Sequence, residues 1–429
     1  MPVNIYLTGF MGCGKSRVGR ELARRLKRPF ADTDEEFAAE YGMGAGECIR
    51  TEGEAEFRKK EQALLRKVAE KYEFAVISTG GGIPAYKGNH EIMASSGIVV
   101  FLDVPLQGIE KRLSAEGRAA RPLWNDGSED ARRMLYESRQ PHYRRAEHIV
   151  AAGGMTPAQC VDAIIASAEK WLVKAPLKSP SFRKLQQSVA RACADYKLLE
   201  PEDRILVGIS GGEDSLMLMH LLQALCRRLP FKVELIPAVV NMELPGFDLE
   251  SLQKYADRQG WGLQVATVPD GERLFREAGA GERPCPMCSR LRRGQLHRLM
   301  DELHCNKLAL GQHLTDLCAS FLISLCRGGG LKTMGPNVPA DGGKARLIRP
   351  LWSNTKKEIH ACAQLFAFPS IRSCPYEKAL EADGDRARME KLIDRLEEEI
   401  PDLQASMRQS MGDIRLAHLL DRRFAPDFE

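Results

Sequence analysis

A glycine-rich loop near the start of the chain has the residues that phosphate chemistry needs. Residues 9–16 read Gly-Phe-Met-Gly-Cys-Gly-Lys-Ser, a full match to the pattern G-x-x-x-x-G-K-[ST]. Gly12 and Gly14 let the backbone curl so that its N–H groups point at phosphate oxygens. Lys15 can reach the β- and γ-phosphates, and the hydroxyl of Ser16 can bind Mg²⁺. The alternative, a chance glycine turn with a lysine, is disfavoured by the apolar segment before the loop and the helical pattern after it.

Two carboxylates and three glycines follow this loop. Asp32 and Asp34 come after the segment RPFA, and on an extended segment side chains at i and i+2 lie on one face. One carboxylate can then enter the Mg²⁺ shell while the other meets a substrate hydroxyl. Gly80, Gly81 and Gly82 follow the apolar stretch AVIST, and glycines at a strand end let a ligand approach the backbone closely. Asp32 alone would also suit a helix N-cap.

Arginines on separate segments add positive charge. The three that stand out are Arg58 in GEAEFRKKE, Arg121 in RAARPLW and Arg139 in SRQPHYRR. Guanidinium groups that converge from different elements suit an anionic substrate and a phosphoryl transition state. Taken singly, each arginine would be interpreted as a solvated surface charge. The functional interpretation therefore depends on the ordered set of motifs.

The motifs occur in the order P-loop, D-T-D, G-E-x-E-F-R-x-x-E, G-G-G, R-P-L and R-x-P-x-Y. This ordered set resembles the shikimate kinase family and covers residues 1–172, essentially the length of that family. The resemblance implies transfer of the γ-phosphoryl group of ATP to shikimate, giving 3-phosphoshikimate for chorismate and aromatic amino acid biosynthesis. Catalysis would then be mostly positioning and charge neutralisation, under a lid that excludes water.

The same resemblance implies roles for single residues. ATP would be bound by the loop residues Gly12, Cys13, Gly14, Lys15 and Ser16. Arg112 would stack on adenine, and Arg121 would contact the phosphates from a lid. Ser16 and Asp32 would hold Mg²⁺. Shikimate would contact Asp34, Arg58, Gly80, Gly81, Gly82 and Arg139. The catalytic residues would be Asp34, Lys15 and Arg121, with Asp34 orienting the accepting hydroxyl and taking its proton late.

A second glycine loop lies about two hundred residues further on. It reads Ser210-Gly211-Gly212-Glu213-Asp214-Ser215, after the apolar segment RILVGI and before a helical pattern. A flexible serine-glycine turn is the plain alternative. The pattern S-G-G-x-D-S resembles the PP-loop ATP pyrophosphatases, which adenylate an oxygen and release pyrophosphate. The resemblance implies that ATP is bound here by Ser210, Gly211, Gly212, Asp214 and Ser215.

Cysteines make the second half more specific. Cys285 and Cys288 have C-x-x-C spacing, and LALGQHLTD, CRGGGLKTMGP, IRPL and FPSIRSCPY follow in order. The set resembles the tRNA 2-thiocytidine synthesis family over roughly residues 180–429. It implies tRNA and a sulfur donor as partners, and a [4Fe–4S] cluster whose three ligands match Cys285, Cys288 and Cys374. Zinc or redox chemistry is the alternative, although structural zinc wants four ligands and thiolates are usual for Fe–S.

This second site departs from the family pattern. Glu213 stands where the loop has lysine, and the segment G-H-H-x-D-D is here Gly-Gln-His-Leu-Thr-Asp at 311–316. Gln312 and Thr315 thus replace a histidine and an aspartate. A carboxylate about 4 Å from a triphosphate would cost on the order of a few kcal/mol near a surface. Two interpretations stay open: an active tRNA sulfurtransferase, or a degenerate PP-loop module that binds RNA or a partner without catalysis.

Both loops need a strand before them and a helix after them, the start of a βα unit in a parallel sheet. We expect the strands at 3–8 and 204–209 and the helices at 17–26 and 216–229. Two such units predict two three-layer α/β domains with parallel sheets, a P-loop kinase fold followed by a PP-loop fold. The Pro-, Ser- and Lys-rich stretch KAPLKSPSFR sets the expected boundaries, namely 1–172, a linker at 173–183, and 184–429.

Composition limits the class of protein. The 429 residues are 44% hydrophobic and 28% charged, as in ordinary soluble proteins, and the net charge of +4 neither demands nor excludes a nucleic-acid partner. No apolar run is long enough to span a membrane and no signal peptide is visible, so we expect a cytoplasmic protein with no membrane partner. Most of the twelve cysteines lie in apolar contexts, such as Cys226 and Cys326, which is typical of buried thiols in a reducing compartment.

Overall fold

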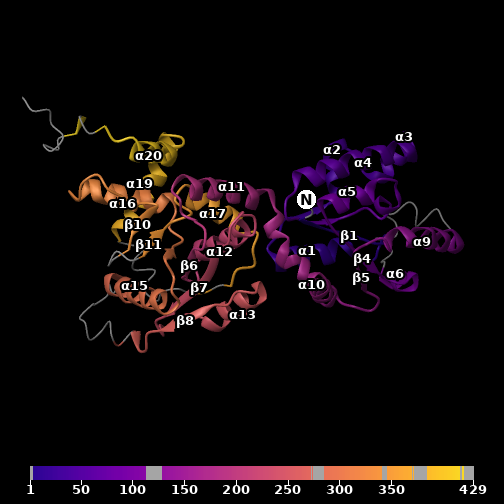
Figure 1. The fold of residues 1–429 in the computed structure, drawn as a ribbon. Helices are drawn as coiled ribbons and strands as arrows, with labels where there is room; N and C mark the ends of the chain where they lie inside the picture. The colour runs from indigo at the N-terminus through magenta and orange to yellow at the C-terminus, as the bar shows by residue number, and fades with distance from the viewer. Residues whose placement is uncertain are drawn as a thin grey trace, which may run out of the picture. The chain divides into compact units, whose positions relative to one another are not determined.

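The structure is a computed structural model, and it divides the chain into two compact units, Met1–Pro180 and Ser181–Glu429 (Figure 1). It describes residues 3–112, 128–271, 273, 285–340, 345–369, 371, 384–415 and 418–419, without the side chains of Arg112, Cys285 and Pro286. The stretch expected to be a linker is largely helical. It holds the end of α10 (Pro157–Lys174), the short 3₁₀ helix η2 (Pro176–Lys178) and the start of α11 (Pro180–Asp195). Its prolines occupy first helical positions, where a missing N–H costs nothing.

The first unit is built on a parallel sheet with the strand order β2-β3-β1-β4-β5. The strands are β1 (Asn4–Thr8), β2 (Phe30–Asp32), β3 (Val76–Ser78), β4 (Gly97–Asp103) and β5 (His148–Ala151). The helices besides α10 are α1 (Lys15–Leu26), α2 (Thr33–Tyr41), α3 (Ala45–Glu52), α4 (Glu54–Lys71), η1 (Ile83–Ala85), α5 (Asn89–Ser96), α6 (Leu106–Arg112) and α9 (Glu129–Tyr143). Because the strands run in parallel, their carboxyl ends share one edge, where β1 leads into the P-loop.

Alternation along β1 shows how the helices cover this sheet. Ile5 and Leu7 pack in a core cluster with residues of α1 and α10, such as Leu22 and Ile164. Tyr6 points to the opposite face and packs with residues of α2 and α4. Successive strand side chains point to opposite faces, so both faces of the sheet are covered and the unit has three layers.

The second unit has a six-stranded sheet in the order β10-β11-β9-β6-β7-β8. Its strands are β6 (Arg204–Ile209), β7 (Glu234–Asn241), β8 (Gln264–Thr267), β9 (Lys307–Ala309), β10 (Asn337–Pro339) and β11 (Arg346–Ile348). All neighbours are parallel except the edge pair β10–β11, which is antiparallel. Besides α11, the helices are α12 (Glu213–Cys226), α13 (Leu249–Gln259), α15 (Cys285–Glu302), α16 (Leu314–Cys326), α17 (Lys356–Ala363), α19 (Asp385–Glu399) and α20 (Leu403–Gly412).

The expected fold class is confirmed: both units are α/β with parallel sheets, and both glycine loops follow the strand that the sequence predicted. Of the two cysteines named as typical buried thiols, Cys226 is partly buried, whereas Cys326 is exposed at the end of α16, so the prediction is wrong for Cys326. Among the described helices, none combines the length and the apolar character that a membrane crossing requires.

Candidate functional site

The P-loop joins β1 to α1 with a backbone that only glycine adopts readily. Gly9, Gly12 and Gly14 have φ angles of +143°, +82° and +103°. A Cβ on Gly9 would also come within 2.9 Å of the carbonyl oxygen of Leu102. The loop therefore needs glycine both for its curvature and for its close approach to β4.

Lys15 and Ser16 are held ready at the start of α1. The ammonium of Lys15 donates to the carbonyl oxygens of Gly9 at 2.9 Å and Phe10 at 3.1 Å, and the residue is only 8% exposed. Ser16 Oγ donates to Asp32 Oδ2 at 2.6 Å. The pair predicted to hold Mg²⁺ thus lies together, and oxygen ligands of this kind are those that Mg²⁺ prefers.

The D-T-D segment is not extended, which corrects the sequence expectation. β2 ends at Asp32, and Asp34 lies in the first turn of α2. The backbone N–H of Asp34 donates a hydrogen bond to Asp32 Oδ1 at 3.0 Å. Asp32 is therefore an N-cap as well as the partner of Ser16, because a carboxylate has enough lone pairs for both bonds. The helical start does not separate the two carboxylates, since Asp32 and Asp34 line the same cavity.

That cavity has a volume of about 250 Å³ and opens beside the P-loop. Its lining comes from the loop, the start of α1, the D-T-D segment and the end of β3, and consists of Met11, Gly12, Gly14, Lys15, Ser16, Arg17, Asp32, Asp34, Ser78, Thr79 and Gly81. Backbone N–H groups, an ammonium and two carboxylates thus face one space. Such a set can bind a phosphate chain with its metal and a hydroxyl substrate next to it.

Two arginines, Arg58 and Arg139, lie against the glycine triple. A Cβ on Gly82 would come within 2.4 Å of Arg58 Nη1, and a Cβ on Gly81 would lie 3.5 Å from Arg139 Nη1. Arg139 is only 7% exposed, and Tyr143, one helical turn further along α9, donates its hydroxyl to Gly81 O at 2.7 Å. The two guanidinium groups therefore approach the same short backbone stretch from α4 and α9.

Sequence reasoning missed Glu61 as a site residue. Glu61 is buried on α4, and its carboxylate accepts a hydrogen bond from Nη1 of Arg58, on the same helix, at 2.6 Å. Burial raises the pKa of Glu61, although the positive charge of Arg58 opposes that shift. A Cβ on Gly80 would lie 3.0 Å from Asp34 Oδ1 and 3.1 Å from Glu61 Oε1, so the two carboxylates flank this glycine. The available signal was the glutamate three positions after Arg58, the spacing of helical neighbours.

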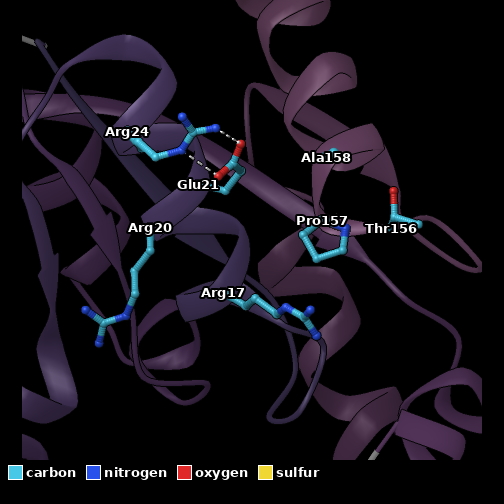
Figure 2. A pocket seen from close by; sticks show the side chains of 7 residues that line it. All are labelled: Arg17, Arg20, Glu21, Arg24, Thr156, Pro157 and Ala158. Atoms are coloured by element: carbon cyan, nitrogen blue, oxygen red, sulfur yellow. Dashed lines mark hydrogen bonds and ion pairs between the residues drawn. The ribbon is translucent and has the colours of Figure 1, made fainter.

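A second cavity of about 480 Å³ lies where α1 meets the start of α10. Its lining is Arg17, Arg20, Glu21, Arg24, Thr156, Pro157 and Ala158. Figure 2 shows Arg17 extending toward the side of Pro157, whereas Arg20 points away from it. Arg17 lines both this cavity and the P-loop cavity.

Two predicted residues of the first unit lie outside the described part of the chain. These are Arg121 and the side chain of Arg112. The lid and the adenine stack therefore stay predictions.

The PP-loop connects β6 to α12 and is closed by its own hydroxyl groups. Ser215 Oγ accepts from Ser210 N at 3.1 Å and donates to Gly212 O at 2.9 Å. Gly211 has φ +89°, and a Cβ there would come within 3.1 Å of the side chain of Ile371, three positions before Cys374 in the sequence. The helix begins at Glu213, earlier than predicted, because Gly212 takes an extended N-cap conformation and two acidic residues favour the first turn.

Asp214 is the most perturbed carboxyl group at this loop. Its Oδ2 lies 3.8 Å from His313 Nε2, and among the described residues its buried Oδ1 has no hydrogen-bond partner. Burial and the charge of Glu213 raise the pKa of Asp214 to about 6. Burial also lowers the pKa of His313 to about 4, so this imidazole is neutral at pH 7. A buried carboxylate oxygen without a partner is costly, and it suits a group that meets a ligand or a metal ion.

The two replaced family residues have structural partners instead. Thr315 Oγ1 donates to Gln404 Oε1 at 2.7 Å and accepts from the N–H of Lys356 at 3.1 Å. The side-chain oxygen of Gln312 accepts a hydrogen bond from the guanidinium of Arg349. Both replacements thus tie neighbouring elements together.

Of the three predicted cluster ligands, only the side chain of Cys288 lies in the described part of the chain. It is partly buried on α15 and packs with residues that include Val240 and Met242, at the carboxyl end of β7. The PP-loop follows the carboxyl end of the adjacent strand β6, so both features lie at the same sheet edge. The side chain of Cys285 and all of Cys374 lie outside the described residues. Within those residues, no group of three His, Cys, Asp or Glu side chains could hold a metal ion.

A cavity of about 330 Å³ in the second unit combines cations with an indole ring. Its lining comes from α11, the turn after β11 and α20, and consists of Lys184, Gln187, Ser188, Arg191, Ala192, Asp195, Trp352, Ser353 and Arg408. The buried Trp352 Nε1 has no hydrogen-bond partner among the described residues. Cations beside an aromatic ring suit a ligand with phosphates and bases.

Comparison with known proteins separates the two halves in the same way. A family model for shikimate kinase matches residues 11–169, and a PP-loop domain model matches residues 179–368. The tRNA-cytidine(32) 2-sulfurtransferases of Geobacter sulfurreducens and Geobacter metallireducens are 37% and 36% identical to this chain over 241 residues. These alignments span 56% of this chain and 93% of each relative. Among solved structures, shikimate kinase from Aquifex aeolicus is 37% identical, with coverage of 39% of this chain and 96% of that one and a TM-score of 0.35.

The two matches use different parts of the chain and account for both glycine loops. The PP-loop, the C-x-x-C motif and the replaced histidine and aspartate all fall in the half that aligns with the sulfurtransferases along nearly their whole length. The chain therefore belongs to the tRNA-cytidine(32) 2-sulfurtransferase family, and it carries a shikimate kinase-like domain in front of the part that defines this family.

Proposed function

We propose that the first unit phosphorylates shikimate with MgATP. The observation that carries this proposal is the grouping of Asp34, Arg58 and Arg139 around Gly80–Gly82, directly beside the P-loop cavity. A carboxylated polyol needs a cationic clamp for its carboxylate and a carboxylate for its hydroxyl, and both lie within reach of the phosphate-binding loop.

In this proposal each residue acts mainly by position and charge. The P-loop N–H groups and Lys15 hold the phosphates, while Ser16 and Asp32 would hold Mg²⁺, which neutralises charge on the phosphate oxygens when bound. Arg58 and Arg139 bind the carboxylate and so aim the accepting hydroxyl at the γ-phosphorus. Asp34 orients that hydroxyl and takes its proton as the new O–P bond forms and ADP leaves. Arg121 would close over the phosphates from the lid.

Replacement of Arg139 tests this site. Arg139→Ala should raise KM for shikimate or lower kcat by about 10- to 100-fold, because a charge-assisted bond to a buried anion is worth about 1.5–3 kcal/mol. The KM for ATP should change far less. Arg133→Ala is the matched control, since Arg133 is on the same helix but exposed and paired with Glu137. Normal shikimate phosphorylation by Arg139→Ala would refute the clamp.

We infer that the second unit is an ATP-dependent sulfurtransferase acting on a tRNA cytidine. Two observations support this function. The chain belongs to the sulfurtransferase family, and beside the closed loop Ser210–Ser215 the buried Oδ1 of Asp214 has no hydrogen-bond partner among the described residues. The cytosine 2-oxygen would attack the α-phosphorus of ATP, and pyrophosphate would leave. Sulfur from a donor would then add at C2, and AMP would leave with the former cytosine oxygen. The loop N–H groups and the positive end of α12 would stabilise the phosphates.

The proposed cluster ligands are Cys285, Cys288 and Cys374. Thiolates are the ligands that iron–sulfur clusters take, and Cys288 lies at the sheet edge where the PP-loop begins. When bound by three cysteines, a [4Fe–4S] cluster would offer one iron for sulfur. The part of this chain would be to hold the cluster with these three thiolates at the sheet edge where the PP-loop begins.

Thionucleoside content separates this proposal from a degenerate module. Cells in which the chain carries Cys288→Ser should lack the 2-thiocytidine that is present in cells with the unchanged chain. Cys326→Ser is the control, because Cys326 is an exposed cysteine at the end of α16. Loss in the first and not in the second supports catalysis. tRNA that binds to the chain but is never thiolated, with or without Cys288, would favour the non-catalytic alternative, for which Glu213 and Thr315 are the motivating residues.

We also propose that the cavity between α11 and α20 contacts the phosphate backbone of this RNA. Lys184, Arg191 and Arg408 bring positive charge to it, and Trp352 can stack on a base. Arg191→Ala should weaken tRNA binding and reduce the salt dependence by about one counterion. Arg258→Ala, on α13 and away from this cavity, is the control. Equal tRNA affinity for the two variants would remove this surface from the proposal.

A further inference from the structure

The carboxylate of Glu213 is held by a neighbouring helix. Glu213 begins α12, at the loop position where the PP-loop pattern has lysine. His360 of α17 lies beside it, with Nδ1 at 2.8 Å and 3.0 Å from the two carboxylate oxygens. The carboxylate that should repel a triphosphate thus lies within hydrogen-bond distance of an imidazole nitrogen, which holds it on the side of α17.

The first turn of α17 is fixed at the mouth of the loop. Thr355 caps the helix, forming a reciprocal capping box with Glu358, and the N–H of Lys356 donates to Thr315 Oγ1 at 3.1 Å. Lys356 and His360 are four residues apart, so they share one helix face. Because His360 meets Glu213, that face is turned toward the start of α12.

Charge interactions agree with this placement of Lys356. Burial acts to lower the pKa of Lys356, but the carboxylates of Glu390, Asp214 and Glu213 outweigh it and the pKa is raised. In return, the positive charges of Lys356 and Arg386 act on Asp214. Lys356 is therefore a cation at neutral pH whose charge acts on the two carboxylates at the start of α12.

The ion pair that now holds Lys356 is weak enough to exchange. Its ammonium lies 3.2 Å from Glu390 Oε2, and the side chain is 53% exposed. An ion pair this exposed contributes little to stability, whereas contact with a phosphate chain is stronger. The flexible four-carbon stem lets the ammonium move without rearranging the helix.

We propose that Lys356 supplies the cation for the triphosphate at the PP-loop, replacing the loop lysine that this chain lacks at position 213. The cation thus comes from a separate helix, while His360 keeps Glu213 engaged. This inference rests on the proposed ATP use by the second unit and names the residue that makes it possible despite Glu213. It is a binding role, with no proton or bond exchanged at Lys356.

Lys357 is a natural control. It has the same charge, is adjacent on α17 and is 66% exposed, close to the exposure of Lys356. Its ammonium lies 3.1 Å from Asp394 and 2.9 Å from Glu397, both on α19. Loss of either lysine should therefore cost similar surface ion-pair energy, but only Lys356 faces the loop.

The experiment uses the full chain with Lys15→Ala, so that nucleotide binding at the P-loop is suppressed, and measures MgATP binding by equilibrium dialysis. Adding Lys356→Ala should weaken binding by about 10-fold or more. Adding Lys357→Ala should change it less than twofold. In the Lys356→Ala chain, Glu213→Lys should restore most of the affinity, a rescue that a purely structural role of Lys356 would not produce.

Two outcomes overturn the inference in distinguishable ways. Equal MgATP affinity of the Lys356→Ala and Lys357→Ala chains, or no rescue by Glu213→Lys, would refute the role of Lys356 and leave the sulfurtransferase proposal standing. If the Lys15→Ala chain neither binds MgATP nor forms AMP and pyrophosphate with tRNA, the proposed function of the second unit fails, and the role of Lys356 fails with it.

Discussion

The two glycine loops occupy the same setting and differ in what surrounds them. At the P-loop, Lys15, Asp32 and Asp34 line one cavity together with Gly81. Arg139 and Arg58 lie against Gly81 and Gly82, beside that cavity. At the PP-loop, two positions of the expected pattern instead bind groups outside the loop: Thr315 donates to Gln404 of α20, and Gln312 accepts from Arg349, just after β11. A strand–loop–helix motif therefore identifies the fold and a phosphate ligand, but not the state of the groups around it.

The lysines make this contrast concrete. Lys15 belongs to its loop and is buried against carbonyl oxygens. Lys356 comes from another helix and is half exposed, and we propose that it does the equivalent work. A cation on a separate element can be moved or lost without disturbing the loop, so the second site can change its residues more easily than the first.

The largest effect should come from Lys15→Ala, which would break the first site and leave the second intact. Loss of a charge stabiliser on a transferring phosphoryl group costs about 10²- to 10³-fold in kcat. Shikimate phosphorylation should fall by that factor, while tRNA thiolation should not change. Lys59→Ala on α4 is the control, because Lys59 is exposed and pairs with Glu56 at the surface. Parallel loss of both activities would contradict the separation of the two sites.

Glu61→Ala should sharpen the account of the clamp. Without the carboxylate of Glu61, the guanidinium of Arg58 loses the partner that lies 2.6 Å from its Nη1 and fixes its orientation. KM for shikimate should therefore rise by roughly tenfold or more. Glu61→Gln, which keeps an acceptor, should lie between this variant and the unchanged chain. Steady-state kinetics with varied shikimate would show it, and an unchanged KM in Glu61→Ala would mean that Arg58 is positioned by other contacts.

The second unit should be the more acid-sensitive one because of His220. This residue is 2% exposed, lies 2.7 Å from the hydroxyl of Tyr255, and has its pKa lowered to about 3 by burial. A depressed folded pKa means that stability is full above the ordinary pKa of 6.5 and falls as pH drops toward 3. Between pH 6.5 and 5 the loss should be about 2 kcal/mol.

His220→Phe should flatten that pH dependence, since phenylalanine cannot be protonated and fits among the aromatic rings of Trp261 and Phe366. Urea unfolding at pH 7 and pH 5 would measure the difference. The same loss of stability with and without His220 would assign the acid sensitivity to other groups.

Thr315→Ala tests whether the replaced family residue has become structural. It removes the hydroxyl between Gln404 and the N–H of Lys356, which should cost about 1–1.5 kcal/mol of unfolding free energy. Thr315→Ser keeps the hydroxyl and should cost less. If the two variants unfold at the same urea concentration, the hydrogen bonds of Thr315 do not explain its presence.

The smallest effect is expected from cutting the chain at the boundary of the two units. Residues 1–180 expressed alone should keep the kcat and KM of the full chain, because domains usually carry their own core and this unit has its own sheet and clusters. A cut at 172, the boundary expected from sequence, would remove the last two residues of α10 and is the informative comparison. An inactive 1–180 fragment would show that the first unit depends on the second.

The sequence by itself determined the fold class, both βα starts and most of the residues that the structure groups beside the P-loop. Apolar strands with glycine loops are local patterns, and local patterns survive folding because backbone sterics decide them. It could not show that Asp34 lies in a helix or that Glu61 joins the clamp. The D-T-D geometry depends on a cap, and the clamp depends on a helix packing against a distant glycine turn.

The tertiary structure alone decided which groups surround the replaced residues of the second site. Glu213, His360 and Lys356 meet only because α17 packs beside the start of α12, nearly 150 residues apart in the chain, as the separation of 147 between Glu213 and His360 shows. Charge is a long-range property, so its effect at a site depends on which groups folding brings near, and no spacing rule along the sequence contains that information.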